Sequence, residues 1–208
     1  MADLGKKDAG GMNVYLLNLA AKLDSLGHTV YVFTRNHEHS EDSDMPLGIR
    51  SKLVHISAGP AEAPKNELIN LVFEFSRNIQ IYMENEDFYL DILHSHYWLS
   101  GLAGDLLSES WKIPHVITFH TLAKTKLKAL TGGDEHISRS ASEYKLMCRS
   151  DKILVLTQKE VQDIDQLYGS FTNKISVVPP GVDLEMFYQS DKNASRYQLN
   201  IPEQNNVV

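Results

Sequence analysis

The stretch that decides the fold is KDAGGMNVYLLNLAAKLDSLGHTVYVFTR, residues 7–35. Apolar residues recur every three or four positions over residues 12–26, which predicts a helix with one apolar face. Gly27 then supplies the usual C-terminal stop of a helix. Residues 29–34 follow with the β-branched and aromatic composition of a strand. The stretch therefore predicts a helix that leads directly into a strand.

Two adjacent glycines, Gly10 and Gly11, stand immediately before this helix, although no strand-like segment precedes them. Glycines at a helix N-terminus allow an anionic or sugar ligand to approach the unpaired backbone N–H groups. An ordinary turn explains the pair equally well when the two residues are taken alone. Their spacing is not the Gly-x-Gly-x-x-Gly of dinucleotide-binding folds, so the sequence disfavours an NAD-dependent dehydrogenase.

The rest of the chain continues to alternate between strand and helix patterns. Strands are predicted at residues 51–56, 90–94, 116–119, 153–156 and 175–178. Helices are predicted at residues 69–83, 98–109, 138–148 and 157–169, the last opening with a Thr-x-x-Glu capping box. Residues 36–48 are polar and predict a loop. The alternation indicates an α/β fold with a doubly wound, mainly parallel sheet, whose ligands bind beyond the carboxyl ends of the strands.

Composition narrows the class of protein. The chain has 208 residues, of which 42% are hydrophobic and 23% charged, which fits one globular domain. A net charge of -7 argues against nucleic acid as the main partner. Cys148 is the one cysteine, so no intramolecular disulfide can form and a cytoplasmic location is expected. We expect neither a signal peptide nor a transmembrane segment, since no apolar run approaches the ~18 residues that a spanning helix requires.

Histidines gather where two predicted strands end. His94 and His96 alternate onto one face of their strand, a pattern that also occurs in metal sites. No third ligand has a matching spacing, so we expect one histidine in the core, the other at the rim of a cleft, and no metal. His120 and Thr121 follow the strand at 116–119, and the topology places them at the cleft.

Three lysines follow this second strand end. Lys124, Lys126 and Lys128 occupy alternate positions. A solvated basic segment explains at least two of them better than a phosphate site does.

Five motifs in order carry a resemblance to a known family: DAGGMNVYLLNLA, GHTVYVFTR, HSHYWLSGLAG, IPHVITFHTLAKTK and VVPPGVDLEMF. Together they resemble the N-terminal, acceptor-side domain of family 4 retaining glycosyltransferases. The sucrose-phosphate synthase and D-inositol-3-phosphate glycosyltransferase branches are the most similar. The resemblance runs from about Leu4 to Phe187, nearly the whole chain.

The resemblance implies one half of a two-domain GT-B enzyme, a hexosyltransferase with a Rossmann-like N-terminal domain. Such an enzyme would need no cofactor and no metal. Its donor substrate would be a nucleotide diphosphate sugar, either a UDP-sugar or an ADP-sugar. The loop that faces the donor phosphate and the acceptor would contain Gly10, Gly11 and Asn13. The histidine beside the transferred sugar would be His120. The residues that bind a phosphorylated acceptor would be Lys65, Tyr97, Thr121 and Arg139.

Two departures from the family pattern give further expectations. The family has an apolar strand before the glycine loop, and here that first strand is expected to be missing, which would leave neighbouring strand edges unpaired. Residues 1–187 would form the glycosyltransferase domain, and residues 188–208 a linker and the start of an absent C-terminal nucleotide-sugar domain. That domain would act as a partner in cis or in trans, and the chain alone would be inactive. The alternative is a non-catalytic binding or interaction module derived from such an enzyme.

Overall fold

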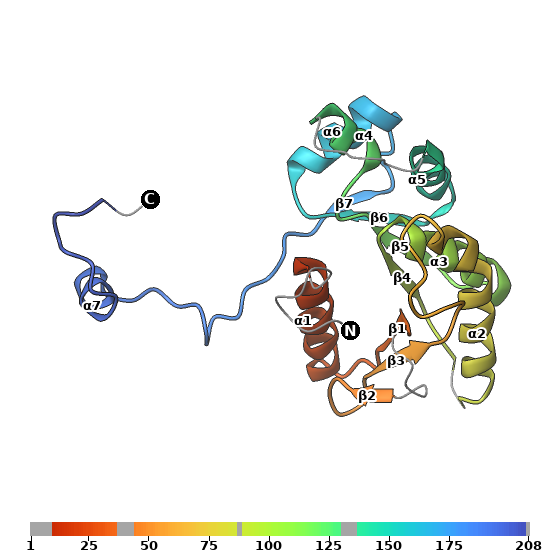
Figure 1. The fold of residues 1–208 in the computed structure, drawn as a ribbon, viewed down its shortest axis with the longest axis horizontal. Coiled ribbons are helices and arrows are strands. Elements are labelled where there is room, and N and C mark those ends of the chain that lie inside the picture. The colour runs from red at the N-terminus through yellow and green to blue at the C-terminus, as the bar shows by residue number, and fades with distance from the viewer. Residues whose placement is uncertain (1–9, 37–43, 87–88, 130–136, 207–208) are drawn as a thin grey trace.

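The computed structural model describes residues 10–36, 44–86, 89–129 and 137–206, in which strands and helices alternate along the chain (Figure 1). The strands are β1 (Tyr31–Arg35), β2 (Asp44–Pro46), β3 (Lys52–Ile56), β4 (Leu93–His96), β5 (His115–Thr118), β6 (Lys152–Val155) and β7 (Ile175–Val177). The helices are α1 (Gly11–Ser25), the 3-10 helix η1 (Leu68–Leu71), α2 (Val72–Glu84), α3 (Trp98–Trp111), α4 (Ala123–Lys128), α5 (Ile137–Arg149), α6 (Gln158–Tyr168) and α7 (Lys192–Gln198).

The strands form two sheets. One has the order β4-β5-β6-β7 and is parallel throughout. The other has the order β1-β3-β2, in which β1 and β3 are parallel and β2 is antiparallel. The α/β class with a mainly parallel arrangement is therefore confirmed, although the described strands make two sheets where the sequence predicted one.

The two sheets expose one strand edge each toward the other. Within the described residues, β1 pairs only with β3, and β4 pairs only with β5. Every residue of β1 is half-buried, whereas Leu53, Val54 and Ile56 of β3 are buried. In the described part of the chain, β1 and β4 are thus edge strands of their sheets, as are β2 and β7.

Helices cover both faces of the parallel sheet. In β4, Ser95 and His96 point to opposite faces because side chains alternate along a strand. Helix α3 packs on the Ser95 face, since a Cβ added at Gly104 would lie 2.1 Å from the Ser95 hydroxyl oxygen. Helix α1 lies on the other face, where Tyr15 contacts the His96 ring.

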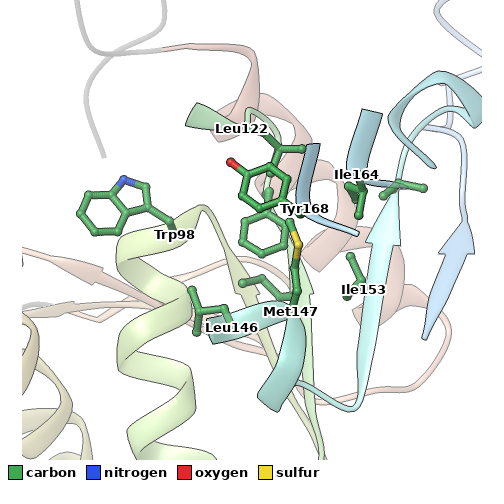
Figure 2. Close-up of a cluster of buried hydrophobic side chains, with 10 residues drawn as sticks. Trp98, Leu122, Leu146, Met147, Ile153, Ile164 and Tyr168 are labelled. Carbon is green, nitrogen blue, oxygen red and sulfur yellow. The ribbon is translucent and has the colours of Figure 1, made fainter. Parts of the chain in front are cut away.

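The main apolar core lies between the parallel sheet and its helices (Figure 2). Its fully buried members include Ile117 of β5, Ile153 of β6 and Met147 of α5. Burying a side chain of this size contributes about 1.5–3 kcal/mol each. A second cluster joins the sheets, since Val54 of β3 and Leu107 of α3 belong to it.

Local capping signals were reliable guides to the ends of helices. The Thr157 side chain accepts a hydrogen bond from the Glu160 N–H at the start of α6, as the capping box predicts. Gly27 and Gly169 follow α1 and α6 and have φ of 96° and 103°, a region that favours glycine.

The sequence prediction differs from the structure in four elements. Strand β4 begins three residues later than predicted, which brings His96 into the strand. Strand β2 lies in the predicted loop 36–48, of which residues 37–43 lie outside the described part. Helix α4 includes the three alternating lysines, and α7 lies in the predicted linker. Strand β2 depends on long-range pairing with β3, which no local pattern reveals.

Candidate functional site

The carboxyl ends of β4 and β5 lie side by side and place a polar cluster at one edge of the sheet. His96 is the last residue of β4 and is in register with Thr118, the last residue of β5. Tyr97 follows β4 directly, and His120 is the second residue after β5. Because β4 and β5 are neighbouring parallel strands, side chains from both converge at this edge.

Two residues at these strand ends have unusual backbone conformations. Tyr97 has φ 77° and ψ 156°, and His120 has φ 59°. Non-glycine residues rarely adopt positive φ, which costs of order 1–3 kcal/mol, and such residues cluster at functional sites. Backbone hydrogen bonds hold the geometry, since the Tyr97 N–H donates to the Thr118 carbonyl (2.9 Å) and the Thr121 N–H to the Phe119 carbonyl (2.7 Å).

Three histidine rings stack at the same edge. His96 Nδ1 and His120 Nε2 are 2.9 Å apart and share a hydrogen bond. The ring centroids of His94 and His96 are 4.0 Å apart, and His94 Nε2 is hydrogen-bonded to the Thr118 hydroxyl (2.9 Å). His96 is buried and His94 is half-buried. Among the described residues, no group of His, Cys, Asp or Glu is arranged to hold a metal ion.

Burial keeps these histidines neutral. It lowers the pKa of His94 to about 4 and the pKa of His96 to about 2, with further lowering from the neighbouring histidine charges. Burial also lowers the pKa of His120. At neutral pH each ring therefore has one donor and one acceptor nitrogen, and the His96–His120 bond uses one of each. A neutral His120 can hydrogen-bond a sugar hydroxyl.

Helix α1 begins beside these strand ends. The Tyr15 ring centroid lies 5.9 Å from that of His96 and 5.4 Å from that of His120. Among the residues that the structure describes, no side chain caps the first turn of α1, and a Cβ at Gly10 or Gly11 would meet no atom within 4 Å. The glycines are thus not required by crowding, and they leave the first-turn backbone of α1 open.

The structure brings together three of the residues expected to bind an acceptor. Arg139 Nη2 donates to the Thr121 carbonyl (2.8 Å) and to the Thr121 hydroxyl (3.1 Å). The Arg139 guanidinium carbon also lies 4.9 Å from the centroid of the Tyr97 ring. Thr121 is exposed and Tyr97 half-buried, whereas Arg139 is only 1% exposed. Arg139 thus reaches the other two from inside the protein.

Lys65 and Asn13 belong to other segments of the chain, and no contact that the structure describes joins either of them to Tyr97, Thr121 or Arg139. Lys65 is exposed and lies four residues before Ile69, which packs against the same apolar cluster as Tyr97. Asn13 is half-buried in the first turn of α1.

The structure identifies residues that the sequence reasoning missed. Glu143 is completely buried and pairs with Arg139 one helical turn before it (Nε to Oε1, 2.8 Å). The four-residue spacing of opposite charges was the available signal. Tyr15 and His96 were also missed as contacts of His120, since both depend on packing between distant elements.

A pocket of about 250 Å³ adjoins His120 and Thr121. Helices α4 and α6 form its walls, through residues that include Lys126 and Asp163. The side chain of Lys124 points elsewhere, since its Nζ donates to the Leu167 carbonyl (2.6 Å). The pocket offers room for a small ring beside the exposed Thr121 hydroxyl.

No helix in the described part of the chain is long and apolar enough to cross a membrane.

Solved structures support the fold. Sucrose-phosphate synthase from Thermosynechococcus elongatus superposes with a TM-score of 0.80 at 24% sequence identity, over 98% of this chain and 50% of that one. The catalytic domain of starch synthase IV from Arabidopsis thaliana is more distant, with a TM-score of 0.58 at 13% identity over 95% of this chain and 57% of that one. The chain has the α/β fold of the N-terminal domain of GT-B glycosyltransferases.

Sequence relatives support the family. D-inositol 3-phosphate glycosyltransferase from Corynebacterium jeikeium is 38% identical over 98% of this chain and 50% of its own length. The protein of that name from Mycolicibacterium smegmatis is 36% identical over 100% of this chain and 49% of its own length. The chain thus spans about half the length of these relatives. The sequence profile of the family described as Glycosyltransferase Family 4 matches residues 9–186. On this evidence the chain belongs to glycosyltransferase family 4.

Proposed function

We propose that this chain is the acceptor-binding part of a retaining hexosyltransferase. The reaction would move a hexose from a nucleotide diphosphate sugar to a phosphorylated sugar or cyclitol. The observation that carries the proposal is the convergence of Tyr97, His120 and Thr121 at one sheet edge, two of them with positive φ. The relatives' names support a phosphorylated acceptor, since they are a D-inositol 3-phosphate glycosyltransferase and a sucrose-phosphate synthase.

The acceptor phosphate would lie against the exposed side of this edge. Thr121 offers a hydroxyl and Lys65 a positive charge, and both residues are exposed. Charge-assisted hydrogen bonds to a dianionic phosphate are strong. Tyr97 would pack against the ring of the acceptor, while Arg139 would act from behind Thr121 and Tyr97.

The donor would approach the N-terminus of α1. Gly10, Gly11 and Asn13 would face its phosphates, and neutral His120 would hydrogen-bond the transferred sugar. The bond from the anomeric carbon to the phosphate oxygen breaks, a bond to an acceptor hydroxyl oxygen forms, and the proton of that hydroxyl passes to the departing phosphate oxygen. Stabilisation of the negative charge on the departing diphosphate is the largest expected contribution, shared between the α1 terminus and the partner domain.

We propose that residues 1–187 form the acceptor-side domain and that residues 188–208 form a linker toward a nucleotide-sugar domain in cis or in trans. The family match ends at residue 186. In Figure 1, α7 lies away from the body of the molecule. Exposed apolar side chains such as Tyr188, Tyr197 and Leu199 occur along this segment, as expected of a surface that packs against a second domain.

Calorimetric titration with D-inositol 3-phosphate and with plain inositol tests the acceptor assignment. We expect the phosphorylated compound to bind more tightly, and Lys65→Ala to weaken it by about tenfold, the size of one charged hydrogen bond. Lys22→Ala is the matched control, because Lys22 is an exposed lysine in the last turn of α1. Equal affinities for the two compounds, or no effect of Lys65→Ala, would remove the phosphate assignment.

A non-catalytic binding module is the second candidate. It is favoured by the chain spanning about half the length of its relatives. Incubation with labelled nucleotide sugar and D-inositol 3-phosphate, with and without a family 4 nucleotide-sugar domain, separates the two. Transfer only in the presence of that domain supports the proposed function. Transfer by the chain alone would contradict the need for a partner domain, and binding without transfer in either case would support the module.

A further inference from the structure

A buried ion pair lies behind the carboxyl ends of β4 and β5, the edge of the sheet at which the acceptor is proposed to bind and which is called the acceptor edge below. Arg139 and Glu143 stand one turn apart on α5 and are 1% and 0% exposed. Burying two charges carries a desolvation penalty that the mutual attraction seldom exceeds. Two apolar side chains at these positions would stabilise the fold as well or better, so stability alone does not account for the charged pair.

Glu143 fixes the start of α4. Its two carboxylate oxygens each accept a hydrogen bond from the Ala123 N–H, both at 3.1 Å. The Tyr168 hydroxyl, at the end of α6, donates to the same carboxylate. Burial and this hydrogen bond raise the pKa of Tyr168, so its hydroxyl keeps the proton that it donates. One carboxylate thus ties α4, α5 and α6 together.

Arg139 extends this network to the acceptor edge. Its Nε donates to Glu143, and its Nη2 donates to both oxygens of Thr121. Its guanidinium also lies under the Tyr97 ring. A planar guanidinium presents separate nitrogens, held in a fixed geometry, to the carboxylate and to Thr121, whereas a lysine ammonium lacks this fixed geometry.

We infer that Glu143 is a positioning residue for acceptor binding: it orients Arg139, and Arg139 sets the Thr121 hydroxyl and the Tyr97 ring from behind. The inference rests on the proposed function, because it assigns the two oriented side chains to a phosphorylated acceptor. It also gives Arg139 a role different from direct contact with phosphate.

Two conservative variants test this role. Glu143→Gln keeps the shape of the side chain but removes its charge. Arg139→Lys keeps the positive charge but removes the planar guanidinium with its separate donor nitrogens. We expect each to weaken binding of D-inositol 3-phosphate by about tenfold, the size of one charge-assisted hydrogen bond. If Arg139 instead bound phosphate directly, Arg139→Lys would retain most of the affinity. Retained affinity in either variant would overturn the inference.

A matched control separates positioning from a general loss of structure. Glu109→Gln removes a carboxylate that accepts from Arg149 (2.8 Å), another arginine of α5, at the opposite edge of the sheet. We expect it to leave the affinity unchanged. All titrations are performed well below the unfolding temperature of each variant, so that each protein is folded during the measurement. If Glu143 and Arg139 served stability alone, their folded variants would bind with the affinity of the wild type.

A measurement without ligand keeps the inference separate from the proposed function. Amide hydrogen exchange at Thr121 and Ala123 should be faster in Glu143→Gln than in the wild type and unchanged in Glu109→Gln. If the wild type fails to bind D-inositol 3-phosphate, the acceptor assignment fails, while faster exchange would still support orientation of Thr121 by Glu143. Unchanged exchange at both amides would overturn the inference whether or not the compound binds.

Discussion

The carboxyl edge of the parallel sheet, where β4 and β5 end, and its amino edge, where β5 and β6 begin, are both rich in polar contacts, but they differ in burial of charge. At the carboxyl edge, Tyr97 and His120 have positive φ, and the ion pair of Arg139 with Glu143 is buried. At the amino edge, Lys112, which ends α3 just before β5, also has a positive φ of 58°, but the ion pair of Arg149 with Asp105 is partly exposed. The difference indicates that contact density alone does not identify a functional site.

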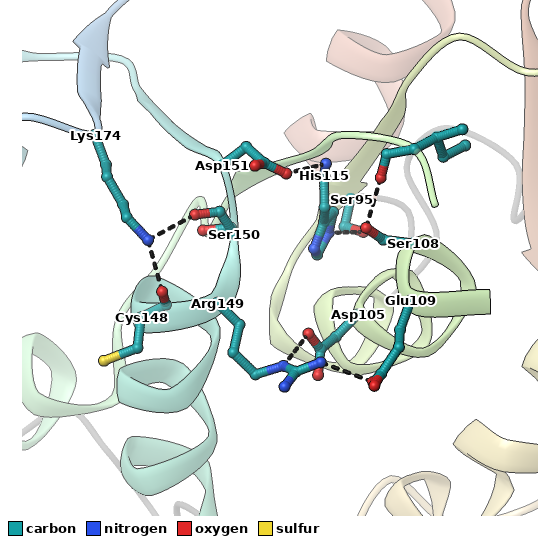
Figure 3. Close-up of polar contacts among 11 residues, drawn as sticks. Ser95, Asp105, Ser108, Glu109, His115, Cys148, Arg149, Ser150, Asp151 and Lys174 are labelled. Atoms are coloured by element: carbon teal, nitrogen blue, oxygen red, sulfur yellow. Dashed lines mark hydrogen bonds and ion pairs between the residues drawn. The ribbon is translucent and has the colours of Figure 1, made fainter. Parts of the chain in front are cut away.

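The amino edge has a network that serves the fold (Figure 3). The His115 N–H donates to the Asp151 carboxylate (2.8 Å), and Arg149 pairs with Asp105 (2.6 Å). Lys174 donates to the carbonyls of Cys148 (2.6 Å) and Ser150 (2.9 Å). These bonds satisfy backbone groups at the start of strands and the end of α5. Their cations are partly exposed, and Arg149 is 42% exposed at its side chain.

Loss of one carboxylate from each edge should give the sharpest contrast. Glu143→Leu removes the carboxylate that pairs with the buried Arg139, and we expect the free energy of unfolding to fall by about 3–5 kcal/mol. Glu109→Leu removes a 62% exposed partner of Arg149, and we expect a change within about 1 kcal/mol. Urea denaturation of both variants measures the two values. Similar losses would remove the distinction between the edges.

Acidification should weaken the carboxyl edge through His94. Its folded pKa of about 4 lies below the usual value of 6.5, so the unfolded chain binds the proton more readily. This stabilisation is complete above pH 6.5 and is lost as the pH falls toward 4, by about 2 kcal/mol between pH 7 and pH 5.

The control for this pH effect is His94→Asn, which lacks the titrating group. Urea denaturation of the wild type and of this variant at pH 7 and pH 5 isolates the contribution of His94. A wild-type loss no greater than that of the variant would contradict the effect of burial on the His94 pKa.

A methyl group added next to the amino-edge network should affect stability and spare binding. In Gly104→Ala the new Cβ would lie 2.1 Å from Ser95 Oγ and 2.6 Å from His115 Nε2, so the buried Ser95–His115 hydrogen bond must shift. We expect a loss of about 1–2 kcal/mol, as for modest overpacking of a core. Affinity for D-inositol 3-phosphate should stay at the wild-type value, and a large drop would show that the two edges are coupled.

Local sequence patterns predicted much of the fold and part of the candidate site. Spacing of apolar residues and capping signals predicted α1 and α6, because such signals lie within each helix. The topology of parallel strands predicted that His120 would lie at the cleft edge. Family resemblance added Tyr97 and Thr121, which the structure places beside it.

The missed features depend on contacts between distant residues. Strand β2 is held by pairing with β3 and by an ion pair between Asp44 and Lys52 (2.8 Å). The burial of Arg139 and the role of Glu143 depend on Tyr168, which lies 25 residues further along the chain. No short pattern contains such contacts, so the resemblance gave Arg139 as a residue that binds the phosphorylated acceptor, and the sequence reasoning overlooked Glu143.

Mapping of backbone amide resonances during titration with D-inositol 3-phosphate tests the central claim most directly. The account predicts the largest shifts at Gly11, Tyr97 and Thr121, with smaller shifts when plain inositol is used. Residues of the amino edge such as Asp151 should not respond. Shifts concentrated at the amino edge, or no difference between the two compounds, would contradict the assignment of the carboxyl edge as a phosphorylated-acceptor site.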